Sequence, residues 1–344
     1  MKSISIAKVV LFSLIAIAIF PRALPAQVTL LSACATIAAP GSYQLSKNLA
    51  SSSDCLKIAA NNVTVDLNGF AISGAGSGRA ITDLGTKRTG LIVRGGTLNH
   101  FATGVALAAS SDINIDHLRV LNMSGDGIDA GPRSVVSYTQ SLSNGGVGIS
   151  VSGSCIVRSN TVGNNQADGI VTGGYCSVRS NNVFNNALAL VGNGISTSSY
   201  CDIRDNVASK NKNWGIESAG GSNFSDNTAS GNGIPGSTPT SGLFGGIFTG
   251  QGSTAASNDA SYNIGLYGIQ GGLNATIADN TASKNRGIGI AVDGNDLLSG
   301  DTASSNTAAG FYVFNCPATL IGDIAQGNPN NYSIHNTCPT WDNF

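Results

Sequence analysis

Residues 156–176 read IVRSNTVGNNQADGIVTGGYC, and variants of this 21-residue segment recur through most of the chain. A fixed repeat of this length is typical of stacked supersecondary units. Its clearest marker is a glycine followed by an apolar residue, found at Gly104-Val105, Gly127-Ile128, Gly148-Ile149, Gly169-Ile170, Gly194-Ile195, Gly215-Ile216, Gly246-Ile247, Gly268-Ile269, Gly289-Ile290 and Gly310-Phe311. The glycines are 23, 21, 21, 25, 21, 31, 22, 21 and 21 residues apart, so we expect a single repeat array.

Two further columns follow the same repeat. Twelve residues before most of these glycines, allowing for insertions, lie Ile92, Ile115, Val136, Val157, Val178, Ile203, Phe224, Ile277 and Leu298. Five residues later lie Thr97, Val120, Ser141, Val162, Val183, Ala208, Ala229, Ala282, Ala303 and Ala325. Three inward columns predict three short strands per coil, each paired with its equivalents above and below. We therefore predict an all-β fold, a right-handed parallel β-helix (β-solenoid) of about 11–12 coils of about 21 residues.

Asparagine marks two bends of the predicted coil. One bend has Asn160, Asn181, Asn206, Asn227, Asn258 and Asn280; the other has Asn122, Asn144, Asn165, Asn186, Asn211, Asn232, Asn263, Asn285 and Asn306. Asparagine tolerates the left-handed backbone region, and stacked amides can hydrogen-bond from coil to coil. These residues are interpreted as structural.

The repeats resemble those of right-handed parallel β-helix proteins of the pectin-lyase-like superfamily. The stretch from Gly41-Ser42-Tyr43 through Cys55 to the segment NVTVDLNG at 62–69 is similar to the opening of many exported bacterial members. The resemblance covers nearly all of the chain after residue 26. It implies the fold, whereas the functions of members range from lyases, hydrolases and epimerases of polysaccharides to adhesins.

The first 26 residues have the composition of a signal peptide. Lys2 and Lys8 precede the apolar run 9–20, and a short segment ending at Ala26 follows, where we expect cleavage. The protein is then predicted to be secreted or periplasmic. A lipoprotein anchor at Cys34 is the alternative.

The remaining chain is expected to form an N-terminal cap at 27–60, the β-helix at 61–325 and a C-terminal cap at 326–344. With 18 basic and 19 acidic residues, the composition does not favour nucleic acid or an anionic membrane as partner. No stretch after the signal peptide is long and apolar enough for a membrane span. The oligomeric state is left open.

Seven cysteines in an exported chain favour disulfides. We predict one bond between Cys34 and Cys55 and another between Cys316 and Cys338. Cys155, Cys176 and Cys201 share one phase of successive coils, where one disulfide or a reduced stack are both compatible with the spacing. No CxxC spacing supports zinc there.

A basic column carries the main functional hypothesis. Arg158, Arg179 and Arg204 each follow an inward residue and should point outward at coil spacing, where three guanidinium groups repel one another unless an anion lies nearby. We interpret the column as a binding surface for uronate carboxylates. The alternative is pairing with local acids, such as Asp202 and Asp205.

Toward the N-terminus, Asp116, His117 and Tyr138 come next to this column. Superfamily lyases remove the proton α to a uronate carboxyl with a basic side chain while a cation neutralises the carboxylate. The resemblance thus implies His117, Tyr138 and Arg158 as catalytic candidates for β-elimination, with Asp116, Arg179 and Arg204 binding substrate. The alternative function is a noncatalytic extracellular binding, adhesion or structural module.

Lys210, Lys212, Trp214 and Tyr267 are predicted to form a second, carbohydrate-contacting rim near two insertions. Glycoside hydrolysis, the other enzymatic alternative, needs paired carboxylates, for which Asp126, Asp129 and Asp168 are the candidates. No acidic cluster suited to calcium is found, and no cofactor is predicted.

Overall fold

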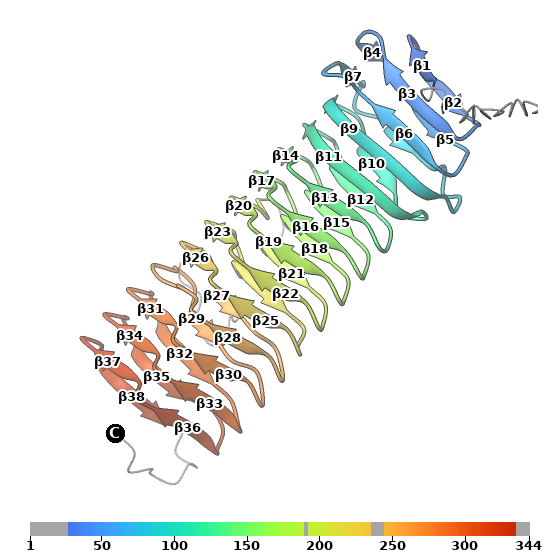
Figure 1. Ribbon diagram of the computed structural model, residues 1–344. Helices are drawn as coiled ribbons and strands as arrows, with labels where there is room; N and C mark the ends of the chain where they lie inside the picture. Colours follow the sequence, from blue (N-terminus) through green and yellow to red (C-terminus); the bar gives the residue numbers. More distant parts are fainter. Residues whose placement is uncertain (1–26, 189–191, 235–243, 335–344) are drawn as a thin grey trace, which may run out of the picture.

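The computed structural model describes residues 27–188, 192–234 and 244–334. All regular elements in these ranges are β-strands, and they stack along one axis into a parallel β-solenoid (Figure 1). The predicted signal peptide at 1–26 lies outside the described residues. So do Cys338 and parts of the two predicted insertions, which lie near residues 187–190 and 233–242.

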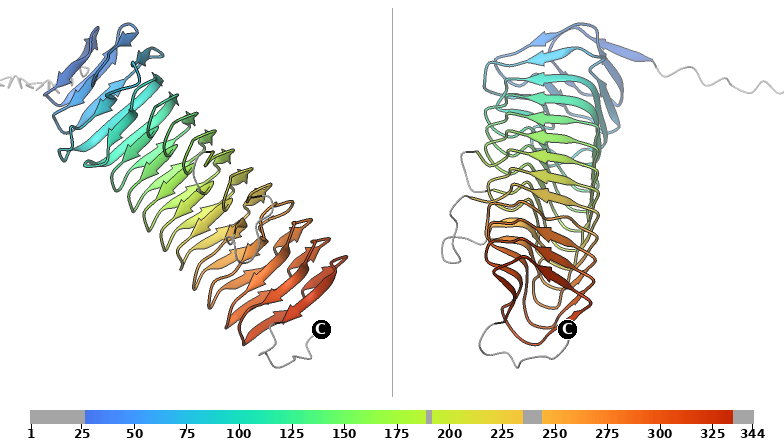
Figure 2. Two further views of the ribbon diagram at one scale, coloured as in Figure 1. Left: turned by 180° about the vertical axis from the view of Figure 1, so that it is seen from behind. Right: turned by 90° about the vertical axis from the view of Figure 1, so that its left-hand side faces the viewer.

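Each coil turns through three faces, and strands pair in parallel with their equivalents in the next coil (Figure 2). Face 1 contains β1 (Val28–Leu31), β3 (Gly41–Leu45), β6 (Val63–Asp66), β9 (Thr89–Asn99), β11 (Ser111–Leu121), β13 (Val135–Ser137), β16 (Ile156–Arg158), β19 (Ser177–Arg179), β22 (Asp202–Arg204), β25 (Asn223–Ser225), β28 (Thr254–Ala256), β30 (Thr276–Ala278), β33 (Asp296–Ser299) and β36 (Ala318–Ile321).

Face 2 contains β4 (Leu49–Ala50), β7 (Ala71–Ser73), β14 (Gln140–Leu142), β17 (Thr161–Gly163), β20 (Asn182–Phe184), β23 (Val207–Ser209), β26 (Thr228–Ser230), β31 (Thr281–Ser283), β34 (Thr302–Ser304) and β37 (Ile324–Gln326). The long strands β9 and β11 bend from face 1 into face 2, because their second halves pair with β7 and β14.

Face 3 contains β2 (Ala35–Ile37), β5 (Leu56–Ile58), β8 (Arg79–Thr82), β10 (Thr103–Leu107), β12 (Ile128–Ala130), β15 (Ile149–Val151), β18 (Ile170–Thr172), β21 (Ile195–Thr197), β24 (Ile216–Ser218), β27 (Gly245–Phe248), β29 (Tyr267–Gln270), β32 (Ile288–Val292), β35 (Ala309–Val313) and β38 (Asn330–Ile334). These 14 strands correspond to about 14 coils, more than the 11–12 expected. The difference arises because residues 27–60 and 326–334 also contribute strands.

The predicted inward columns form the core. Val136, Val157 and Val178 lie in register on face 1 and are fully buried. One coil differs from the prediction by one residue, since Val93 and Leu98, rather than Ile92 and Thr97, align with Ile115 and Val120. That coil bends at Gly95, whose φ of 74° matches the left-handed bend at His117 in the next coil.

Each coil turns at three bends, and a residue with positive φ recurs at each. The first bend, between faces 1 and 2, has His117, Tyr138, Ser159, Ser180, Asp205, Asp226, Ser257 and Asp279. The second, between faces 2 and 3, has Ser143, Asn164, Asn185, Lys210, Tyr262, Lys284 and Ser305. The third, between faces 3 and 1, has Asp112, Arg133, Ser154, Tyr175 and Tyr200.

The two asparagine columns are confirmed as hydrogen-bonded ladders. In the first, Asn181 Nδ2 donates to Asn206 Oδ1 at 3.0 Å and to the Val157 carbonyl at 2.9 Å, while Asn206 Oδ1 also accepts from the Asn181 backbone N–H. Buried turn groups are thereby satisfied in each coil. Asn122 is the exception in the second column, because Met123 occupies the buried position and Asn122 bonds Asn99 on the surface.

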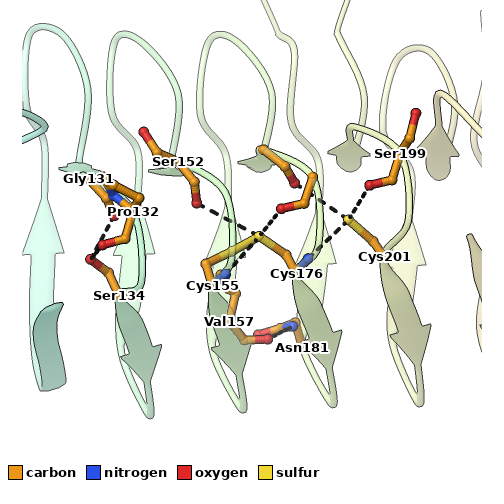
Figure 3. The surroundings of a disulfide bond; sticks show 12 residues. Gly131, Pro132, Ser134, Ser152, Cys155, Val157, Cys176, Asn181, Ser199 and Cys201 are labelled. Atoms are coloured by element: carbon orange, nitrogen blue, oxygen red, sulfur yellow. Dashed lines mark hydrogen bonds between the residues drawn. A yellow bond between two sulfur atoms is a disulfide. The ribbon is translucent and has the colours of Figure 1, made fainter. Parts of the chain in front are cut away.

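Two disulfides are present among the described residues. Cys34 and Cys55 are bonded, the pair expected from the sequence. Cys155 and Cys176 form the second bond, with a Cα separation of 4.5 Å, and Cys201 follows in the same column as a buried free thiol (Figure 3). The pairing of Cys316 with Cys338 stays a prediction.

The first asparagine ladder ends in an aspartate. Asp301 Oδ1 accepts from the Asn280 backbone N–H at 2.7 Å and from Asn280 Nδ2 at 2.9 Å. Its Oδ2 occupies the place of an amide nitrogen, is buried, and has no hydrogen-bond partner among the described residues. The next ladder position is Asp323, whose Oδ1 accepts from the Asp301 backbone N–H. Burial, with Asp323 nearby, raises the pKa of Asp301 to about 7.

We predict that Asp301→Asn stabilises the protein more at pH 8 than at pH 5. Because the folded state raises the pKa of Asp301 from 3.8 to about 7, the folded state holds the proton more tightly. This contribution to stability is complete below about pH 4 and is lost as the pH rises through about 7. Thermal unfolding of both proteins at the two pH values measures it. Equal shifts in Tm at both pH values would contradict the assignment.

Candidate functional site

The arginine column lies on the outer side of face 1. Arg158, Arg179 and Arg204 align in successive strands β16, β19 and β22. Each follows a buried residue, so alternation along the strand turns the guanidinium group outward.

The three arginines differ in their partners. Arg158 Cζ lies 5.5 Å from the centre of the Tyr138 ring. Arg204 Nε lies 3.3 Å from Asp202 Oδ2, close enough for an ion pair but not aligned as a hydrogen bond. Arg179 makes no ion pair or side-chain hydrogen bond with any described residue. Only one of the three charges is therefore neutralised by a neighbouring acid.

The predicted catalytic residues meet at the first bend. The His117 and Tyr138 rings stack with centroids 5.1 Å apart, and Arg158 lies over Tyr138. His117 Nδ1 is 2.7 Å from Asp116 Oδ2, and Ser137 Oγ donates to Asp116 Oδ1 at 2.9 Å. Both rings reach the surface because left-handed φ values of 51° and 50° turn their side chains out of the coil.

The hydrogen bond to Asp116 sets the state of the imidazole. An ionised carboxylate only accepts, so Nδ1 carries a hydrogen and Nε2 of a neutral His117 has a free lone pair. The His117 side chain is 64% exposed, so this lone pair is open to a ligand. We call Asp116, His117, Tyr138 and Arg158 the first-bend cluster; it combines the imidazole of His117, which can act as a base, with a nearby guanidinium group.

The predicted aromatic rim takes a different form. Trp214 and Tyr267 are 5% and 1% exposed and stack with centroids 6.2 Å apart. They pack outside face 3 with Ile288, Ala291 and Ala309 in a second apolar cluster, so neither ring is presented to a sugar. Lys210 and Lys212 remain exposed, and Lys212 Nζ donates to the Leu188 carbonyl.

Half-buried carboxyl groups line the outer side of face 3. Asp168 Oδ1 accepts from the Asn193 backbone N–H at 2.8 Å, and Asn193 Nδ2 donates to Glu217 Oε2. Burial raises the pKa of both Asp168 and Glu217. We call Asp168 and Glu217, which Asn193 links by hydrogen bonds, the face 3 carboxyl pair.

The three predicted carboxylates Asp126, Asp129 and Asp168 therefore do not form one group: Asp129 interacts with Asp126, and Asp168 interacts with Glu217. Burial and the charge of Asp126 raise the pKa of Asp129, whereas Asp168 is linked to Glu217. Sequence reasoning missed Asn193 and Glu217. One signal was available, because Glu217 is the only glutamate in the chain and follows the apolar residue of the repeat marker.

Within the described ranges, no three His, Cys, Asp or Glu side chains come together as they would around a metal ion. Nor does this part of the chain contain a helix long and apolar enough to cross a membrane.

A family model described as "Right handed beta helix region" matches residues 103–260. No curated protein matches the chain by sequence. Among solved structures, the A-module of a mannuronan C-5 epimerase of Azotobacter vinelandii is similar, with a TM-score of 0.50 and 15% identity over 90% of this chain and 88% of that chain.

Two further structures have lower scores. The catalytic unit of an α-1,3-glucanase of Streptomyces thermodiastaticus gives a TM-score of 0.48 and 14% identity over 91% of this chain and 65% of that chain. A periplasmic alginate epimerase gives a TM-score of 0.41 and 13% identity over 87% of this chain and 76% of that chain. At such identities the likeness concerns the fold alone.

We predict that Trp214→Ala acts on stability, because Trp214 packs against Tyr267 and Phe248. The substitution should lower the free energy of unfolding by about 3–5 kcal/mol, the usual cost of truncating a buried tryptophan. Tyr262→Ala, at an exposed ring, is the matched control and should change it by less than about 1 kcal/mol. Urea unfolding measures both, and equal stabilities of the two variants would contradict the assigned role.

Proposed function

We propose that this chain, a right-handed parallel β-helix whose residues 103–260 match a right-handed β-helix family model, is exported, binds an acidic polysaccharide on face 1 and cleaves it by β-elimination. The observation that carries this proposal is the first-bend cluster, in which Asp116, His117, Tyr138 and Arg158 are in contact. Each has a distinct part in the reaction.

Binding is assigned to the arginine column. Arg179 has no acidic partner among the described residues, so its guanidinium group can donate two parallel N–H···O hydrogen bonds to a uronate carboxylate. Arg158 and Arg204 flank it at coil spacing, about 4.8 Å on each side. The column therefore favours a polymer with a carboxylate on successive sugars over a neutral one.

Cleavage requires a base, an acid and a cation at one uronate. His117 Nε2 removes the proton α to the carboxyl, and Arg158 stabilises the negative charge that develops on the carboxylate. The electron pair of the broken C–H bond forms the C4–C5 double bond, and the C4–O glycosidic bond breaks. Tyr138 is the candidate to protonate the leaving oxygen, since its ring lies directly on His117.

Export is supported by the covalent chemistry of the chain. The bonds Cys34–Cys55 and Cys155–Cys176 would persist in an oxidising compartment and not in a reducing cytosol. A mannuronan C-5 epimerase shares the fold. Uronate polymers are accordingly the substrates to test first.

We predict that His117→Asn lowers the rate of unsaturated-product formation by about 100-fold or more, the usual worth of a positioned base. Asparagine suits the left-handed φ of 51°, so the bend is kept while the base is lost. The measurement is ultraviolet absorbance during incubation with a panel of uronate polymers.

His100→Asn is the matched control, since His100 is an exposed histidine with φ of 61° at another bend. It should retain full activity. If the wild-type protein forms no unsaturated product from any polymer, with or without calcium, β-elimination is wrong. Binding without turnover in the same panel would instead support a noncatalytic module.

A second candidate function, glycoside hydrolysis, is favoured by the face 3 carboxyl pair. Hydrolysis needs one carboxyl that donates a proton to the leaving oxygen and another that activates water or attacks. Burial raises the pKa of Asp168 and Glu217, and this favours a carboxyl that holds its proton. Asn193 holds the two groups beside each other.

For this candidate we predict that Glu217→Gln abolishes the release of reducing ends, with no unsaturated product formed by either protein. Glutamine preserves the size of the side chain and removes the titratable group. Asp279→Asn, at an exposed first-bend carboxyl, serves as control. Reducing-end release that survives Glu217→Gln would eliminate the pair as the hydrolytic site.

A further inference from the structure

Two tyrosines form an exposed stack at the third bend. Tyr175 and Tyr200 have ring centroids 5.2 Å apart and an interplanar angle of 17°. They are 70% and 60% exposed, among the most exposed aromatic side chains of the described residues. Left-handed φ values of 60° and 63° turn both rings out of the coil. The stack therefore adds little to the core, and it presents aromatic surface to a ligand.

The neighbours of the stack leave one ring face open. Gly221 follows Tyr200 in the next coil, and a Cβ added there would lie 2.7 Å from Tyr200 Cε1. The Tyr200 ring therefore rests on the Gly221 backbone, which fixes the stack from one side. On the other side the same bend holds Ser154, whose side chain is too short to cover a ring. The free face of Tyr175 thus points toward the coil that carries Arg158.

The arginine column runs across the same strands. Tyr175 precedes β19, which ends at Arg179, and Tyr200 precedes β22, which ends at Arg204, so each tyrosine lies four residues before its arginine. Four residues of a strand span about 13 Å. Face 1 thus has exposed aromatic rings along one edge and arginine side chains near the opposite edge. Aromatic rings stack on the apolar faces of sugars, and guanidinium groups bind their carboxylates.

We propose that Tyr175 and Tyr200 form an accessory subsite that stacks on a sugar ring of the acidic polysaccharide, at a distance from the bond that is cleaved. This proposal rests on the proposed function, because it assigns the same polymer to the same face. The occupant is an acidic polysaccharide rather than a protein, since Arg179, which has no acidic partner among the described residues, ends the strand that Tyr175 precedes.

The positions define the path of the polymer. From Tyr175 it crosses face 1 to Arg179, follows the arginine column to Arg158 and reaches His117, which lies three coils before Tyr175. The path covers about 15 Å across face 1 and about 15 Å along the axis. A short oligosaccharide at His117 cannot also contact Tyr175. The subsite should therefore strengthen binding of long chains and leave short ones unaffected.

The experiment measures binding of size-fractionated oligogalacturonates and oligomannuronates by calorimetry, without reference to turnover. Tyr175→Asn and Tyr200→Asn remove a ring while keeping a residue that accepts the left-handed bend. Each should weaken binding of long oligomers about 3- to 10-fold, the usual worth of an aromatic contact, and leave binding of disaccharides unchanged. Tyr175→Phe keeps the ring and should bind as the wild type does.

Tyr262→Asn is the matched control, since Tyr262 is an exposed tyrosine at the second bend with φ of 58°. It should bind oligomers of every length normally. Length-dependent weakening confined to the Tyr175 and Tyr200 variants supports the subsite even if no oligomer is cleaved, so its test is separate from that of β-elimination. Unchanged affinity of both variants for long oligomers overturns it, as does the absence of binding by the wild-type protein.

Discussion

The fold depends on the need to satisfy buried turn polarity in every coil at the same place. The asparagine ladders meet this need, because each amide accepts from the coil before it and donates to the coil after it. Each bond contributes only about 0.5–1.5 kcal/mol, whereas an unpaired buried group costs about 1–3 kcal/mol. A bend that shifted out of register would leave buried asparagine groups without hydrogen bonds, and this penalty keeps the bends aligned from coil to coil. The apolar columns can then be filled by residues as different in size as Phe224 and Ala255.

This constraint explains how much of the fold could be predicted from the sequence. Where the same buried residue type recurs, the alignment of the coils is clear, as in the nine-residue column of Val157 and the six-residue column of Asn181. The errors fall where the repeat changes. Val93 and Leu98 were missed because one coil has a different length, and Asn122 was misplaced because a methionine takes its buried position.

The site was predicted less completely, for a different reason. Outward positions carry no repeated signal, so each must be inferred from a few residues. Asp116, His117, Tyr138 and Arg158 could be grouped because one strand register connects them. Trp214 and Tyr267 were misjudged, since the sequence does not show that an apolar cluster outside face 3 buries them. Asn193 and Glu217 were not predicted as site residues, because the hydrogen bond that joins them runs between two successive coils.

The near-constant length of the coils sets how this molecule can change over evolutionary time. When one whole 21-residue coil is duplicated or deleted, the coils on either side still align in all three apolar columns and both asparagine ladders. Removing a single residue instead shifts a bend out of alignment. The solenoid can therefore lengthen or shorten in steps of one coil without redesign of its interior. Each added or deleted coil would lengthen or shorten the outer faces by one strand each. The length of polymer that the protein can contact would therefore change with the number of coils.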